Sequence, residues 1–137
     1  MPLWIIYALF ALFFYGLWGF YPKLATMCLD YKSILLYEVV GILLAVAIVS
    51  VVVPGKIAWH GKGFLFALLT GLSGMIGTCF FLLALKHGKA SVVILFTSLY
   101  PLLSLLLVLI FLKESLTLKQ MIAAGLAIAS LILFALS

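Results

Sequence analysis

The stretch SILLYEVVGILLAVAIVSVVV, residues 33–53, decides the fold, because its 21 residues include a single charged side chain. A helix of about 20 apolar residues is long enough to cross the hydrocarbon core of a bilayer. Four more apolar blocks of similar length lie around it, at 3–25, 63–85, 90–112 and 118–137. Backbone groups in lipid must be hydrogen-bonded within their own segment, so each block is expected to be helical. The sequence therefore predicts an all-α membrane protein with five transmembrane helices in a single domain, residues 1–137.

The composition agrees with this prediction and excludes several classes of protein. Hydrophobic residues make up 69% of the 137, charged residues 8%, and the mean hydropathy is +1.48. A soluble domain is about half apolar and about a quarter charged. The net charge of +5 is spread over the helix ends, whereas a nucleic-acid site needs a clustered basic face. We expect a multi-pass protein of the cell (inner) membrane, surrounded by the lipid bilayer, with no nucleic-acid partner, no metal site and no cofactor.

The basic residues divide evenly between the two ends of the predicted helices. Five spans place the chain termini on opposite sides of the membrane. One side then carries Lys56, Lys62, Lys113 and Lys119, and the other carries Lys23, Lys32, Lys86 and Lys89. Orientation normally follows an excess of Lys and Arg in cytoplasmic loops. Because this chain has no such excess and no arginine, we expect it to insert in both orientations.

Glu38 is the only acidic residue inside an apolar block. It lies five residues past Ser33, so roughly 8 Å along the helix, between the interface and the bilayer centre. A carboxylate at that depth is costly and normally faces a cavity or a partner. One hypothesis is a proton- or cation-binding group in a transport path. The alternative is a structural glutamate that is neutral, that snorkels to the interface, or that pairs with Lys23.

Pro101 lies at the centre of the fourth block, beside Thr97, Ser98 and Tyr100. Proline has no backbone N–H and clashes with the carbonyl four residues earlier, so it should kink the helix. Freed carbonyls and hydroxyl groups at membrane depth can bind a polar substrate, as in the broken helices of transporters. A purely structural kink, in which serine and threonine side chains satisfy the freed groups, is equally compatible with the sequence.

Two further sets of residues are candidates for binding or packing. Tyr15 and Trp18 share one face of the first block and could contact an aromatic or cationic ligand in a cavity, or could be ordinary packed or lipid-facing rings. Small residues at helical spacing let two helices approach closely. The predicted helix-packing residues are Thr70, Gly74, Gly77 and Thr78 in the third block and Gly125 and Ala129 in the fifth.

Four short motifs, in order along the chain, carry a family resemblance. They are Leu17-Trp18-Gly19 followed by Lys23; Gly71-Leu72-Ser73-Gly74-Met75-Ile76-Gly77 leading to Ala84-Leu85-Lys86; Ala90-Ser91 running to Ser98-Leu99-Tyr100-Pro101-Leu102; and Phe111-Leu112-Lys113-Glu114-Ser115-Leu116-Thr117 with Gln120 and Gly125. Together they resemble the EamA-type repeat of the drug/metabolite transporter superfamily over nearly the whole chain. Glu38 departs from the family pattern, which often has an arginine at about this place.

The resemblance implies half a transporter. Many family members carry two five-helix repeats in opposite orientations, and this chain has one. The second unit would be another copy, giving an antiparallel ten-helix homodimer, or a paired five-helix chain. The balanced lysines independently permit the homodimer.

We therefore expect a secondary transporter of a small polar or amphipathic metabolite that works by alternating access, with proton coupling at Glu38 as one option. Two other functions stay open: a non-transporting scaffold or accessory subunit, and a flippase for a lipid-linked substrate. An enzyme is not expected. Gly71-Leu72-Ser73-Gly74 looks like the nucleophile motif of rhomboid proteases, but that chemistry needs a base within hydrogen-bond reach of Ser73, and both histidines are expected in loops.

Overall fold

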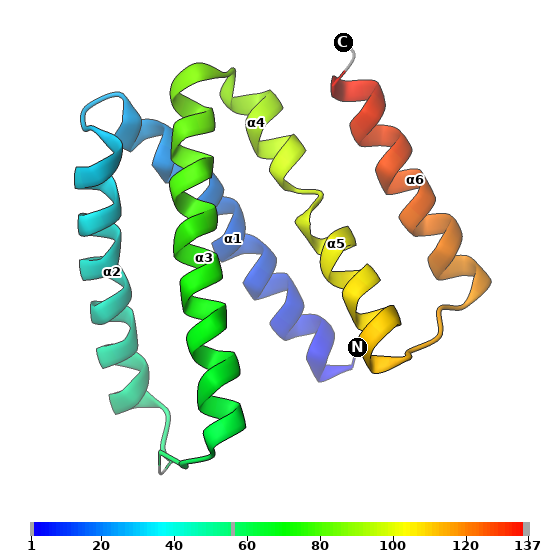
Figure 1. Ribbon diagram of the computed structural model, residues 1–137, viewed down its shortest axis with the longest axis horizontal. Helices are drawn as coiled ribbons and strands as arrows, with labels where there is room; N and C mark the ends of the chain where they lie inside the picture. Colours follow the sequence, from blue (N-terminus) through cyan, green and yellow to red (C-terminus); the bar gives the residue numbers. More distant parts are fainter. Residues whose placement is uncertain (1, 56, 136–137) are drawn as a thin grey trace. The chain divides into compact units, whose positions relative to one another are not determined.

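The computed structural model describes residues 2–55 and 57–135, and all the regular structure in these ranges is helical (Figure 1). The helices are α1 (Leu3–Thr26), α2 (Tyr31–Val52), α3 (Gly61–His87), α4 (Ala90–Thr97), α5 (Tyr100–Leu107), the π-helix η1 (Val108–Leu112) and α6 (Leu118–Ala135). The chain forms two compact units, Met1–His87 and Gly88–Ser137.

The all-α prediction is confirmed for the described residues, and α1, α2 and α3 begin and end within two residues of the predicted blocks. Four stretches in the described ranges are long and apolar enough to cross a membrane: α1, α2, α3 and Ala90–Leu112. The fifth, α6, is apolar but shorter, at 18 residues. Lys56 and the last two residues of the predicted 118–137 helix lie outside the described residues.

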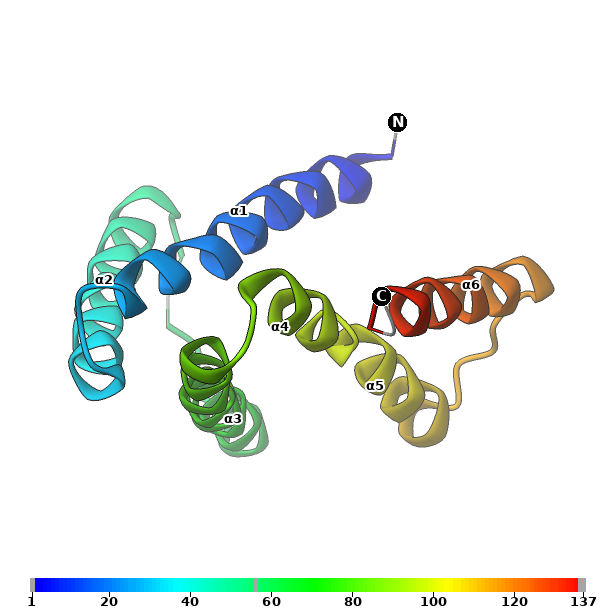
Figure 2. The same ribbon diagram turned by 90° about the horizontal axis from the view of Figure 1, so that it is seen from above.

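The first unit packs mainly at one end, where α1 and α3 finish and α2 begins. Its buried side chains are Pro22, Ile34, Thr78, Phe81, Leu82 and Leu85. Leu82 and Leu85 are fully buried. Toward its first residue α1 diverges from α2 and α3, as two perpendicular views show (Figure 1 and Figure 2). The unit is therefore closed at one end and open at the other.

Asp30 fixes the start of α2 at the closed end. Its carboxylate accepts hydrogen bonds from the backbone N–H groups of Lys32 and Ser33 and from the Ser33 hydroxyl, which satisfies donors that the first helical turn leaves without partners. The Ser33 hydroxyl is the main reason that the pKa of Asp30 lies below its ordinary value of 3.8. A lowered pKa means that the stabilisation is present above the ordinary pKa and is lost as pH falls through the folded-state pKa.

We expect Asp30→Ala to lower the thermal midpoint at pH 7, and the difference from the parent to shrink as the pH falls below the ordinary pKa of aspartate and the parent carboxylate is protonated. Asp30→Asn is the matched control, because asparagine also caps helices but does not titrate. Circular dichroism melts in detergent measure the effect. A difference that does not change with pH would show that the charge of Asp30 plays no part.

The second unit contains the interrupted fourth span and α6, and α4 packs against α6. After η1 the chain turns at Lys113, which adopts the left-handed conformation (φ 54°) that ends many helices. Thr117 and Gln120 then start α6 by a reciprocal cap: Gln120 Oε1 accepts from the Thr117 N–H at 2.8 Å, and Thr117 Oγ1 accepts from the Gln120 N–H at 3.4 Å. Among the side chains described in this unit none is buried, so lipid or another protein must cover them.

Candidate functional site

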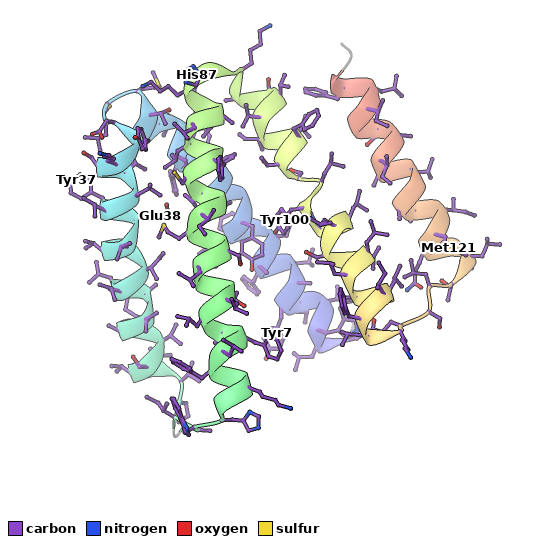
Figure 3. The ribbon with its side chains drawn as sticks, in the orientation of Figure 1. Tyr7, Tyr37, Glu38, His87, Tyr100 and Met121 are labelled. Carbon is purple, nitrogen blue, oxygen red and sulfur yellow. The ribbon has the colours of Figure 1, made fainter. Side chains whose placement is uncertain are left out.

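Glu38 projects from α2 on the side that faces α3, while the neighbouring Tyr37 points to the other side of α2 (Figure 3). Because α2 begins at Tyr31, Glu38 lies about 10 Å along the helix. Its side chain is half-buried, and its Oε1 accepts a hydrogen bond from Trp18 Nε1 on α1 at 2.9 Å. The structure thus brings together two of the residues predicted as candidates, from two different helices.

Phe81 of α3 holds the Trp18 indole in place. The two rings are stacked, with centroids 5.7 Å apart and an interplanar angle of 16°. Phe81 is buried in the closed end of the unit, whereas Trp18 keeps 44% of its surface exposed. A tightly packed ring therefore positions an accessible one, and α1, α2 and α3 all contribute to orienting the Glu38 carboxylate.

An open groove of about 240 Å³ runs between α1 and α2 beside this carboxylate. Its lining residues are Trp18, Tyr21, Pro22, Ala25, Leu29, Ile34, Tyr37 and Glu38. The lining is apolar and aromatic apart from the carboxylate, the indole N–H and two phenol hydroxyls. Ligand sites commonly combine an apolar wall with a few placed polar groups in this way.

Lys23 lies on the same helix as Trp18 but does not neutralise Glu38. Its ammonium donates a hydrogen bond to the Leu85 carbonyl at 3.4 Å, in the last turn of α3. Cations stabilise that end of a helix because unpaired carbonyls give it a partial negative charge. Lys23 therefore links α1 to the end of α3. The suggested Glu38–Lys23 ion pair is not observed among the described residues.

The kink predicted at Pro101 is confirmed as a full break between α4 and α5. Leu99 N donates to the Phe96 carbonyl at 3.2 Å, three residues back, which tightens the last turn of α4. The Thr97 and Ser98 hydroxyls bond back to carbonyls of their own helix, at Val93 and Ile94. Tyr100 is 58% exposed. The four predicted residues gather at this break, and a role in substrate binding stays a prediction.

Pro101→Ala should restore a backbone hydrogen bond and join α4 to α5. Proline inside a helix is about 3 kcal/mol less favourable than alanine, so stability should stay level or rise by up to that amount, while transport should fall because the bend is lost. Far-UV circular dichroism and flux in liposomes check the two halves of the expectation. Pro54→Ala, in the loop after α2, is the control. Unchanged flux in the folded Pro101→Ala protein would reduce the break to a structural detail.

The other predicted residues lie outside the groove. Tyr15 is on α1 one turn before Trp18 and is 63% exposed. Thr78 is buried within the first unit, and its hydroxyl bonds to the Gly74 carbonyl at 3.0 Å. A Cβ added at Gly74, Gly77 or Gly125 would meet nothing within 4 Å, and Thr70 and Ala129 are exposed. Their packing against a partner therefore stays a prediction.

Tyr21, Tyr37 and Phe81 were not predicted as site residues: the two tyrosines form an aromatic wall of the groove, and Phe81 stacks on Trp18. Helical spacing carried a usable signal for the wall. On α1 the lining positions 18, 21, 22 and 25 follow the pattern of a single helix face, and on α2 so do 34, 37 and 38, while Leu29 lies in the loop between the two helices. No comparable signal identifies Phe81, because α3 is apolar on all sides.

Comparison with known proteins agrees with the motifs. The model of the EamA-like transporter family matches residues 2–136. The chain is also similar to an uncharacterized protein of Methanocaldococcus jannaschii, with 32% identity over 133 residues that cover 97% of this chain and 96% of the relative. No solved structure matches. The resemblance drawn from four sequence motifs is thereby confirmed, and the chain belongs to the EamA-like transporter family of membrane proteins.

Proposed function

We propose that the protein is a secondary transporter of a small polar or amphipathic metabolite in the cell (inner) membrane, and that Glu38 is its coupling or substrate-binding group. The observation that carries the proposal is the carboxylate held at membrane depth by Trp18, beside an open groove. Ionisable residues at such depth mark ion or substrate pathways by default, because a purely structural role rarely offsets their cost. A family of transporters, not enzymes, supplies the matching context.

The working unit proposed is an antiparallel homodimer, ten helices in all, with a paired five-helix chain as the alternative. Residues 2–136 match the family model once, and the alignment with the relative from M. jannaschii covers 96% of that protein. The even lysine distribution removes the usual barrier to opposite orientations. The exposed apolar surface of both units leaves room for a partner.

Alternating access would use the groove in turn from each side of the membrane. In one state the Glu38 carboxylate carries a proton, and in the other it carries a cationic group or hydrogen-bonds the substrate. The Trp18 N–H donates to the Glu38 carboxyl group and orients it toward the groove. Exchange of the proton for the substrate at Glu38 would couple substrate transport to proton movement across the membrane.

The open side of the groove favours a second candidate, the flippase for a lipid-linked substrate. A lateral opening between α1 and α2 would let a polar headgroup enter while its acyl chains stay in the lipid. A non-transporting scaffold or accessory subunit is the remaining alternative.

Liposomes that contain only this chain decide between these functions. We would trap the pH-sensitive dye pyranine inside, add a panel of amphipathic amines, acids and sugars outside, and follow internal pH and radiolabelled uptake. Transport predicts saturable, solute-dependent flux that protein-free liposomes lack. Movement of a fluorescent lipid alone would favour the flippase. No flux of any kind from folded protein would favour the scaffold.

A further inference from the structure

The groove between α1 and α2 is lined by one carboxyl group, that of Glu38, and no cation lies among its lining residues in the part of the chain that the structure describes. Glu38 Oε1 accepts from the Trp18 N–H, which is a neutral donor. Lys23 is engaged with the Leu85 carbonyl, and the residues that the structure describes provide Glu38 with no ion pair. A carboxylate at membrane depth is stabilised by a cation that reaches it. The groove should therefore prefer cationic ligands, and a transport function alone does not require this preference.

Aromatic rings extend this preference along the groove. Trp18, Tyr21 and Tyr37 line it, and the faces of such rings attract cations electrostatically. Phe81 stacks on Trp18 but is not part of the lining, so the exposed part of the indole remains available.

The size and polarity of the groove restrict the rest of the ligand. A volume of about 240 Å³ has room for one ring or short alkyl chain and a compact head group. A solute rich in hydroxyl groups would lose hydrogen bonds with water that an apolar wall cannot replace. An anion would be repelled by the carboxylate.

These features lead to a single ligand class. We propose that the groove binds an organic monocation with an apolar body, such as an aromatic or alkyl quaternary ammonium, with Glu38 as counter-ion and the Trp18, Tyr21 and Tyr37 rings around the head group. The inference rests on the proposed function and names the substrate class of that same site. The same head group could come from a free solute or from a lipid.

Two probes of the same shape and opposite charge test the proposal directly. Benzyltrimethylammonium and benzylsulfonate share the benzyl body and have a tetrahedral head group. Isothermal titration calorimetry on the whole chain in dodecyl maltoside should show saturable binding of the cation and none of the anion. Glu38→Gln should weaken cation binding by at least about 10-fold, because the charge attraction is lost. Glu114→Gln, an exposed acidic residue outside the groove, should leave it unchanged.

Equal binding of the two probes by the parent would overturn the proposal, and so would unchanged cation affinity in a folded Glu38→Gln protein. If that variant does not fold, the comparison of probes on the parent alone decides. Displacement of the cation by short-chain phosphatidylcholine, and not by phosphatidylglycerol, would support the site and assign its ligand to a lipid headgroup; no displacement would support the site with a free solute.

This result is separable from the outcome for transport. Cation binding without flux in liposomes would keep the site and remove the transporter function. Flux of a solute by protein that discriminates neither probe would keep the transporter and overturn the ligand class.

Discussion

Glu38→Gln protein in liposomes is expected to lose the pH dependence of its flux, with proton-driven accumulation reduced at least about tenfold. Glutamine preserves the shape of the side chain and its acceptor for the Trp18 N–H, but it cannot release a proton at any relevant pH. The groove therefore stays intact while the titrating group is removed. Uptake of the solute identified in the liposome screen, measured across a range of external pH, gives the result.

Two matched variants make this experiment specific. Glu114→Gln removes an acidic residue outside the groove, and Lys23→Met removes the cation that the structure places on the Leu85 carbonyl. Both should keep the pH profile of the parent, although Lys23→Met should lower stability because it releases a contact between α1 and α3. An intact pH profile in Glu38→Gln would exclude the carboxylate from the coupling step.

The second large effect concerns orientation. Gly55→Lys with Ala58→Lys adds two charges to the loop between α2 and α3, which should fix that loop in the cytoplasm. Neither change disturbs packing, since a Cβ at Gly55 meets nothing within 4 Å and Ala58 is exposed. The variant alone should lose nearly all flux, because all copies then insert the same way and no antiparallel dimer forms.

Complementation provides the control for this prediction. His87→Lys with Ser91→Lys, both at exposed positions, biases the chain the opposite way. Each double variant alone should be inactive, and the two expressed together should recover most of the parent flux. Full activity of either variant by itself would rule out the antiparallel homodimer.

Labelling reports the orientation directly, since the chain supplies its own probe. Cys28 is exposed just after α1, and Cys79 is the other cysteine. In a Cys79→Ala background, a membrane-impermeant maleimide should label the parent from both sides and each double variant from one. Labelling of the parent from a single side would favour a paired chain as partner.

The helices could be predicted from sequence because each depends on the summed hydrophobicity of about 20 residues. A few atypical side chains do not change that sum enough to matter. The break at Pro101 was predictable for a different reason: the missing N–H acts locally and needs no partner. The break begins three residues earlier, at Ser98, because the chain tightens before it reaches the proline.

The geometry of the site was less accessible from sequence. Glu38 and Trp18 were each recognisable, but their contact depends on how α1 and α2 are rotated about their own axes. In helices that are apolar on every side, hydrophobicity gives almost no preference for one rotation, since lipid covers an apolar face as well as protein does. Contacts with α3 orient α1 instead: Trp18 stacks on Phe81, and Lys23 donates to the Leu85 carbonyl.

The one-ended packing of the first unit has a consequence for the energetics of an inverted pair. Buried side chains hold the three helices together at one end, and α1 diverges from α2 and α3 at the other. Each copy would therefore open by a hinge motion about its packed end, which lies near one membrane surface. In an inverted second copy the packed end would lie near the opposite membrane surface. The first copy would open toward one side of the membrane and the second toward the other. The symmetry of the pair makes these two motions equivalent. The two states of such a homodimer must be degenerate in free energy, and the gradients across the membrane alone would give the cycle a direction.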